Sequence, residues 1–312
     1  MEVFTAPKGL IVDLISPLNN NGSIDGRGLG RLLDLIIPHA DAILLSSPYM
    51  GEGRNLDLIQ RLELLEKALV VIRGSLPIFF WVTQETEDKT RETVLVLNKA
   101  LKKKAYTGQV FWIDSSLYYH SNRGLFSHYQ DICSMVDQGI ILHNDPELIK
   151  ERSNAFKRNN IRSSILKELT FLPGIVGMIF FGSLARAHNY QEACRRRSHF
   201  RIYDGDESHF LDHPSMSGVI SAGANLAPRV WQSIVQSSLQ MTGFQQNHQS
   251  YHRHIRKLGH YLQNLKEIYH AMPVPIVKGV LSNMKIIETP TSTLPTKDVK
   301  QSVNKIMDQV YR

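Results

Sequence analysis

Cysteine is scarce in this chain of 312 residues, because only Cys133 and Cys194 occur and no CxxC pair is present. This scarcity excludes a disulfide scaffold and a thiolate zinc site, and it favours a reducing compartment. Long apolar runs are missing too. The longest candidate, 171–187, is interrupted by Pro173 and three glycines, whereas a membrane helix needs about 18 or more apolar residues. Because segment 1–15 lacks the basic-then-apolar order of a secretory signal, we expect a cytoplasmic protein with no membrane segment.

A strong charge of one sign is also absent. The chain has 36 Lys plus Arg against 29 Asp plus Glu, a formal net charge of +7, and its pI is about 9.3. The runs KKK at 102–104 and RRR at 195–197 each close a segment of helical pattern, where cations favour the helix dipole. Neither run is interleaved with aromatic residues, so nucleic acid is not the expected partner.

Short apolar runs alternate with segments of helical period along the first three quarters of the chain. Eight runs are predicted to be buried strands, at 9–16, 41–47, 78–83, 109–116, 139–145, 174–181, 200–206 and 218–225. Helical periodicity falls between them, at 25–38, 56–72, 86–104, 127–137, 160–169 and 184–196. Such alternation predicts a parallel sheet, and eight units in about 225 residues fit a (β/α)8 TIM barrel. A doubly wound open sheet is the alternative, but no GxGxxG follows the first strand to support a nucleotide-binding version.

The pattern changes after Pro228, where the remaining segments are all of helical type. The stretches PVP at 273–275 and ETPTSTLP at 288–295 interrupt them, and proline-rich stretches of this kind end helices. We therefore expect an α/β protein with two parts, a barrel over 1–227 and a C-terminal helical region over 228–312.

In a barrel of this type, the functional groups follow the C-terminal ends of the strands. The segments that follow the predicted strands, or lie between them, carry a series of motifs: SPLNNNGSIDGRGLGRLLD (16–34), MGEG (50–53), LYYHSNRGLFSHY (117–129), ILHNDP (141–146), LPGIVGMIFFGS (172–183), DGDES (204–208), GVISAGANLAP (218–228) and PVPIVKGVL (273–281). In this order and spacing they resemble the signatures of the dihydrodipicolinate synthase and N-acetylneuraminate lyase family. The resemblance covers nearly the whole chain. It implies a class I aldolase-like barrel, a lyase or synthase that forms a Schiff base with pyruvate or a related 2-oxo acid, and a homo-oligomer, either a dimer or a tetramer.

The catalytic positions of that family carry different residues in this chain. The Schiff-base lysine falls on Ile179, and the tyrosine of the family's ILYNVP motif falls on His143. Two threonines that hold the carboxylate of the oxo acid fall on Tyr49 and Met50, whereas Tyr119 matches the second tyrosine of the family's Tyr-Tyr pair. An isoleucine has no lone pair with which to form an imine, and segment 170–230 contains no lysine. We therefore expect no Schiff-base chemistry.

Besides a basic surface protein for nucleic acid, which is the least favoured, two functional hypotheses remain, and whether the protein is an enzyme stays open between them. The first is a pseudoenzyme that binds a small 2-oxo acid or related acidic metabolite, or serves as a partner subunit. The second is a lyase that uses His143 and Tyr119 without a Schiff base. His143 suits a general base, since the reference pKa of histidine is near 6.5, but it suits equally a neutral side chain that fills a tyrosine-sized space. The residues expected to line the ligand pocket are Ser16, Tyr49, Met50, Glu52, Asp206 and Ile220.

We expect no cofactor and no metal ion. The acids near strand ends, such as Asp114, Asp145 and Asp204, would suit a hard cation only if they converged, and carboxylates in these places also cap helices. His248, His252 and His254 include an i,i+4 pair, which can bind zinc, but their polar neighbours indicate a solvated helix face. Because the substitutions at 49, 50 and 179 add bulk and remove hydroxyls and a charge, the sequence predicts a narrower and less polar barrel mouth than in the family.

Overall fold

The computed structural model describes residues 5–152, 158–215, 217–239, 248–295 and 298–310. At its centre, eight parallel strands pair in chain order, and β8 pairs with β1 to close a barrel. The strands are β1 (Gly9–Asp13), β2 (Ala42–Leu45), β3 (Ile78–Trp81), β4 (Val110–Asp114), β5 (Gly139–Asn144), β6 (Ile175–Phe180), β7 (Arg201–Asp204) and β8 (Gly218–Ser221). Each falls within an expected range. The TIM-barrel prediction is confirmed.

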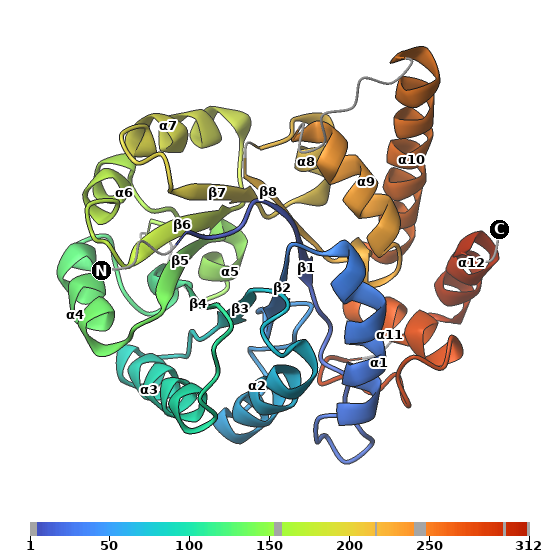
Figure 1. Ribbon diagram of the computed structural model, residues 1–312, viewed down its shortest axis with the longest axis horizontal. Helices are drawn as coiled ribbons and strands as arrows, with labels where there is room; N and C mark the ends of the chain where they lie inside the picture. Colours follow the sequence, from blue (N-terminus) through green and yellow to red (C-terminus); the bar gives the residue numbers. More distant parts are fainter. Residues whose placement is uncertain (1–4, 153–157, 216, 240–247, 296–297, 311–312) are drawn as a thin grey trace.

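Helices surround the barrel, as Figure 1 shows. The six expected between strands are α1 (Gly26–Ile36), α2 (Leu58–Ile72), α3 (Glu87–Lys103), α4 (Leu125–Met135), α6 (Ser163–Leu169) and α7 (Leu184–Cys194). Short helices not expected from the sequence are α5 (Pro146–Lys150) and α8 (Glu207–Asp212), and the single turns η1 (Ile37–His39), η2 (Ser116–Tyr118) and η3 (Gly223–Asn225). No described helix is long and apolar enough to cross a membrane.

The strands divide their side chains between two cores, because successive residues of a strand point to opposite faces. Outward residues such as Leu10 and Val12 pack under the helices, whereas inward residues such as Ile11 fill the barrel. Inside the barrel, the ring of Phe79 meets Phe111 and Tyr203 edge to face, at centroid distances of 5.5 and 5.7 Å. The interior is therefore a packed core rather than a pore, as is usual for this architecture.

The N-terminal segment closes the floor of the barrel, at the N-terminal ends of the strands. The side chain of Ala6 belongs to the interior core. The hydroxyl of Tyr203 donates to the carbonyl of Pro7 at 2.6 Å, and Arg201 Nε donates to the carbonyl of Ala6 at 3.1 Å. A ligand site inside the barrel therefore has to open at the other end, the mouth formed by the C-terminal ends of the strands.

The C-terminal region consists of α9 (Pro228–Ser238), α10 (His248–Tyr269), α11 (Pro273–Asn283) and α12 (Lys300–Val310). α9 packs against β1 and η1, so the helix that starts the expected C-terminal part also belongs to the ring around the barrel. α10 and α12 lie to one side of the barrel (Figure 1). The segment after α11 returns to the mouth, where Thr289 Oγ1 donates to the carbonyl of Leu18 at 2.8 Å. The division at 227 stays a prediction.

Candidate functional site

Asp13 is an acid inside the mouth that the sequence analysis did not single out. It ends β1 on the same face as Ile11, which lies in the barrel interior. Its Oδ1 atom is buried and has no hydrogen-bond partner among the described residues. Burial raises the pKa of this carboxyl to about 7; a bond from the Ser47 side chain opposes the rise and the nearby charge of Glu207 adds to it. The carboxyl is thus partly protonated at neutral pH and able to donate or accept a proton. The available signal was a single acid in the otherwise apolar strand GLIVD.

Ile179 lies on β6, with one register partner on each of the two adjacent strands. Its register partners are His143 on β5 and Tyr203 on β7, and its side chain is fully buried in the interior core. This is the position that the resemblance assigns to the Schiff-base lysine. An aliphatic side chain here seals the wall and offers no amine to the mouth.

His143 is buried and hydrogen-bonded to Ser115. Trp81 Nε1 donates to Ser115 Oγ at 2.8 Å, and the same oxygen lies 2.8 Å from His143 Nδ1. The direction of this second bond depends on the tautomer of His143, because a serine hydroxyl can donate once and accept twice. Burial lowers the pKa of His143 to about 4, although the charge of Asp114 opposes this. The ring is therefore neutral at pH 7, which favours a pocket-filling donor over a general base.

Tyr119 belongs to a separate network around Asp114. Its hydroxyl lies 2.8 Å from Asp114 Oδ2, to which Tyr129 also donates at 3.0 Å, while Thr83 donates to Oδ1 at 2.6 Å. The Tyr119 oxygen also lies 2.9 Å from His128 Nε2. Burial, together with the charge of Asp114, holds the pKa of the Tyr119 phenol well above its usual range. No hydrogen bond among the described residues joins Tyr119 to His143, although the two networks meet at the adjacent residues 114 and 115.

Glu52 is part of a buried ion pair rather than an open ligand group. Its side chain and that of Lys278 are both fully buried, and Lys278 Nζ donates to Glu52 Oε2 and to the carbonyl of Thr291. The other carboxylate oxygen accepts from Ser292 Oγ at 2.7 Å and from Thr293 N at 2.6 Å. Burial lowers the pKa of Lys278, and the charge of Glu52 opposes that fall. The pair ties the loop after β2 to α11, and its further hydrogen bonds tie both to the segment after α11.

The loops at the rim hold three more of the expected pocket residues. Ser16 Oγ donates to the carbonyl of Gly51 at 2.7 Å, and Met50 is buried in the helix-side core. Tyr49 is 38% exposed, and the guanidinium carbon of Arg54 lies 6.0 Å from the centre of its ring. Burial and nearby acids raise the pKa of the Tyr49 phenol.

Ile220 and Asp206 have different surroundings. Ile220 is buried in the barrel interior, opposite Ile11 of β1. Asp206 caps α8 by accepting from Ser208 N at 2.7 Å, and it pairs with Lys266 at the same distance. Its side chain is about half exposed and its partners lie at the surface, so the structure does not bring it into contact with the groups of the mouth.

A second buried acid, Glu207, was also missed by the sequence analysis. Its Oε1 accepts from Ser221 Oγ at 2.6 Å and from Gly223 N at 2.8 Å, and its Oε2 accepts from Tyr269. This carboxylate is fully engaged in joining α8, η3 and α10. Its role at the mouth is its charge, which helps to keep Asp13 protonated.

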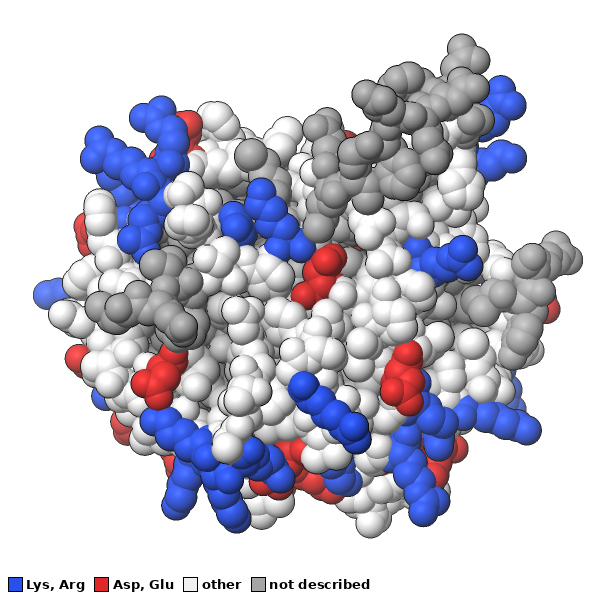
Figure 2. Space-filling model, in the orientation of Figure 1, with Lys and Arg blue, Asp and Glu red and all other residues white. Residues whose placement is uncertain are grey.

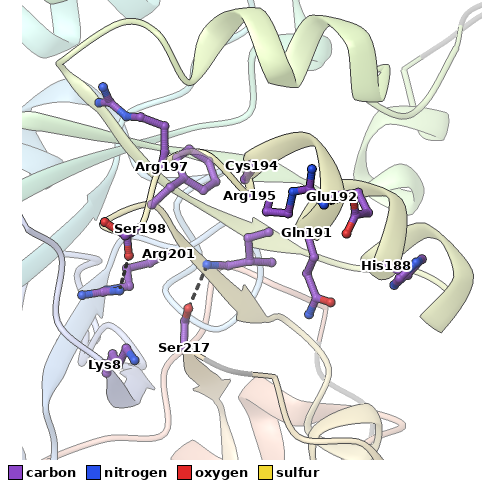
Figure 3. A pocket seen from close by; sticks show the side chains of 12 residues that line it. Lys8, His188, Gln191, Glu192, Cys194, Arg195, Arg197, Ser198, Arg201 and Ser217 are labelled. Carbon is purple, nitrogen blue, oxygen red and sulfur yellow. Dashed lines mark hydrogen bonds and ion pairs between the residues drawn. The ribbon is translucent and has the colours of Figure 1, made fainter.

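Two surface cavities of about 370 Å³ each lie away from the mouth. One lies along α2, next to Glu63 and Lys67, and reaches Gly26 at the start of α1 and Lys104 at the end of α3. The other lies by the floor and is lined by basic side chains including Lys8, Arg195, Arg197 and Arg201, as Figure 3 shows. Lys and Arg also gather over the region of α7 in Figure 2. Because Arg201 is used to hold residues 6 and 198, and because the N-terminal end of such barrels serves stability, we place the functional site at the mouth.

Comparison with known proteins agrees with this fold and motif order. A model of the dihydrodipicolinate synthetase family matches residues 6–310. The chain belongs to this family. Among its curated relatives, the 4-hydroxy-tetrahydrodipicolinate synthase of Methylococcus capsulatus is 25% identical over 285 residues, 90% of each chain. That of Shewanella sp. strain W3-18-1 is 25% identical over 236 residues, 74% of each chain.

Solved structures of the dihydrodipicolinate synthetase family share the fold. The dihydrodipicolinate synthase of Bacteroides thetaiotaomicron superposes with a TM-score of 0.80 at 15% identity, covering 98% of this chain and 99% of its own. The 4-hydroxy-tetrahydrodipicolinate synthase of Methylacidiphilum fumariolicum gives 0.77 at 23% identity, covering 98% and 96%. The family resemblance inferred from the motifs is therefore confirmed.

Proposed function

We propose that this member of the dihydrodipicolinate synthetase family does not form an imine with pyruvate, and that its mouth holds a small oxo compound without a covalent bond. One observation carries the proposal. The side chain at the position of the Schiff-base lysine, Ile179, is fully buried in the barrel wall. Imine formation needs a neutral primary amine within reach of the carbonyl carbon.

Lys278 shares one property with such a nucleophile, because burial lowers the pKa of its amine. Its donors, however, point to Glu52 and to the carbonyl of Thr291. Releasing the amine would leave a buried carboxylate unpaired, which costs several kcal/mol. Lys278 therefore stabilises the rim and does not replace the missing nucleophile.

Asp13 supplies the polar contact for the ligand. Because its pKa is raised to about 7, its neutral form can donate a hydrogen bond to the oxygen of a ligand that its charged form would repel. A 2-oxo acid or related acidic metabolite is consequently held better below pH 7 than above it. His143 is neutral at pH 7, and in the tautomer that carries its proton on Nε2 it is a second donor of the same kind.

The alternative, a lyase that uses His143 and Tyr119, finds less support in these contacts. The pKa of His143 is lowered to about 4, which makes it a weak base, and the Tyr119 hydroxyl is engaged with Asp114. A homo-oligomer and a cytoplasmic location remain expectations from the sequence and the family resemblance.

Intact-mass spectrometry after incubation with pyruvate and borohydride tests the proposal, because borohydride reduces an imine to a stable adduct. We expect no mass gain, while a family enzyme that carries the lysine, treated in parallel, gains one reduced pyruvate. A stoichiometric adduct on one lysine of this chain would refute the proposal.

Ile179→Lys is the converse variant. A lysine buried in this wall either destabilises the fold or gives up its proton and becomes uncharged. We expect this variant to restore no turnover, since positions 49, 50 and 143 still differ. Rapid turnover of that variant would contradict the described mouth.

A further inference from the structure

Three side chains that no part of the proposed function uses come together beside the Asp114 network. Glu87 lies in the first turn of α3, His120 follows η2, and His128 lies in α4. One ligand atom from each lies within 4.8 Å of the other two. α3 and α4 are neighbours in the ring of helices (Figure 1), so the cluster joins two helices and the loop between β4 and α4.

The proton positions in this cluster follow from the partners of His128. The Asp114 carboxylate accepts hydrogen bonds from tyrosine hydroxyls, so the single proton of Tyr119 points to Asp114. The Tyr119 oxygen then accepts from His128 Nε2 at 2.9 Å. With the proton on Nε2, the neutral ring has its lone pair on Nδ1. That atom is buried, makes no hydrogen bond to a described residue, and lies 3.1 Å from Glu87 Oε1.

Two electron-rich atoms facing each other at this distance repel. The Arg91 guanidinium lies 2.7 Å from Glu87 Oε1 and offsets part of its charge, but it makes no hydrogen bond to His128 Nδ1. A second proton on His128 is one way to give Nδ1 a favourable contact, and a metal ion is the other. His120 distinguishes the two. Its Nδ1 lies 2.7 Å from the carbonyl of Ser121, which can only accept, so the lone pair of a neutral His120 lies on Nε2. A proton shared between His128 and Glu87 does not involve the lone pair of His120 Nε2, whereas a metal ion can bind it.

We propose that Glu87, His120 and His128 bind one divalent transition-metal ion, for which Zn²⁺ is the best fit. Two imidazoles and one carboxylate are a zinc donor set that leaves a position open. Tyr119 and the carbonyl of Ser121 each fix the tautomer of one histidine, as second-sphere partners of metal-bound histidines do. The side chain of His128 is 1% exposed, which gives the site a fixed wall.

The spacing requires a small adjustment. Tetrahedral zinc ligands at about 2.0–2.2 Å from the ion lie roughly 3.3–3.6 Å apart, so a ligand atom at the 4.8 Å limit has to move inward by about 1 Å. His120 is half-buried in a loop, where such a movement is easy. Its ring centre lies 5.0 Å from that of His128, and the two rings are stacked at an interplanar angle of 25°. Because the lone pair of an imidazole lies in the ring plane, the His120 ring also has to rotate for both nitrogens to reach one ion.

Charge around the cluster permits a cation. Arg91 Nη2 lies 2.7 Å from Glu87 Oε1 and opposes it, but the same guanidinium also lies 3.4 Å from Asp131. With Glu87, Asp131 and Asp114 nearby, acids outnumber this single arginine. Arg91 is then a partner that orients the carboxylate of Glu87.

Zinc titration of the untagged, chelator-treated full chain tests the proposal by isothermal calorimetry, with Mg²⁺ as the comparison ion and Co²⁺ absorption as the reporter of tetrahedral geometry. We expect one Zn²⁺ per chain, the visible bands of tetrahedral Co²⁺, and no comparable Mg²⁺ binding. His120→Gln alters a half-buried loop residue that the fold tolerates. It should weaken zinc binding by more than about a hundredfold, and Tyr119→Phe, which keeps all three ligands, by about 10–100-fold.

His252→Gln is the matched control, since it removes the i,i+4 histidine pair on α10 and should leave the zinc affinity unchanged within about twofold. Circular dichroism of each variant confirms that it is folded. Absence of stoichiometric zinc binding to the wild-type chain would overturn the proposal. So would undiminished binding by folded His120→Gln, or a loss of binding in His252→Gln that equals the loss in His120→Gln.

Discussion

Asp114 and Asp13 end two strands at the same end of one barrel, yet their surroundings differ. The carboxylate of Asp114 accepts from the hydroxyls of Thr83, Tyr119 and Tyr129. The carboxyl of Asp13 has one buried oxygen without a partner among the described residues, and its pKa rises to about 7. One acid is fully engaged by the protein, and the other is left for something else to engage.

The difference distinguishes a buried polar group that stabilises the fold from one that is available to a ligand. A buried polar group with partners contributes to stability, whereas one without partners costs about 1–3 kcal/mol. Such a cost concentrates at sites where a ligand supplies the missing bond. Glu52 and Glu207 resemble Asp114 in this respect, since all of their carboxylate oxygens accept hydrogen bonds from the chain. This comparison is the reason to centre the ligand site on Asp13 rather than on the more numerous acids of the rim.

Lys278→Met tests the rim side of the comparison and has the largest expected effect. Removal of one partner leaves Glu52 charged, buried and unpaired, so the free energy of unfolding should fall by about 3–5 kcal/mol. Urea unfolding followed by circular dichroism measures it. The double variant with Glu52→Gln should recover part of the loss, because no uncompensated charge remains. A loss below about 1 kcal/mol in Lys278→Met would show that the rim pair is not structural.

Asp13→Asn tests the centre and should act in the opposite direction. The folded-state pKa of Asp13 lies above its unfolded value of 3.8, so the folded protein binds the extra proton and stability falls as the pH rises towards and through about 7. At pH 8 the asparagine variant should be more stable than the wild type by about 1–3 kcal/mol. The variant should also bind a 2-oxo acid with less dependence on pH.

Unfolding measured between pH 6.5 and 8 isolates this effect. His143, whose pKa is lowered to about 4, destabilises the fold only as the pH falls below the 6.5 of the unfolded state. Across the chosen window the wild type should lose about 1 kcal/mol more than Asp13→Asn does. Equal slopes for the two proteins would mean that Asp13 is ionised throughout and that the two acids do not differ as described.

Tyr129→Phe has the smallest expected effect and sharpens the comparison further. It removes one of the three hydroxyl donors to Asp114 and leaves the other two in place. A single buried hydrogen bond contributes about 0.5–1.5 kcal/mol, so the melting temperature should fall by a few degrees. A loss as large as that of Lys278→Met would indicate that the three donors act as one cooperative unit.

The sequence alone predicted the barrel, because apolar runs and helical periods are local patterns and eight of them in order admit few arrangements. Through the GIVGM motif it also assigns Ile179 to the position of the Schiff-base lysine, and that assignment stays a prediction. α5 and α8 were missed, since five and six residues give too little periodicity. Their signals were the capping acids Asp145 and Asp206.

Only the tertiary structure decided which polar groups meet. Lys278 lies 226 residues from Glu52 along the chain, and Glu87, His120 and His128 come from three separate segments. The contact of His143 with Ser115, and the Asp13 oxygen that has no partner in the described part of the chain, likewise depend on which face of each strand turns inward and on what packs beside it. Local sequence determines whether a segment is a strand or a helix, but the partner of a buried charge is set by the closure of the whole barrel, which brings distant segments together.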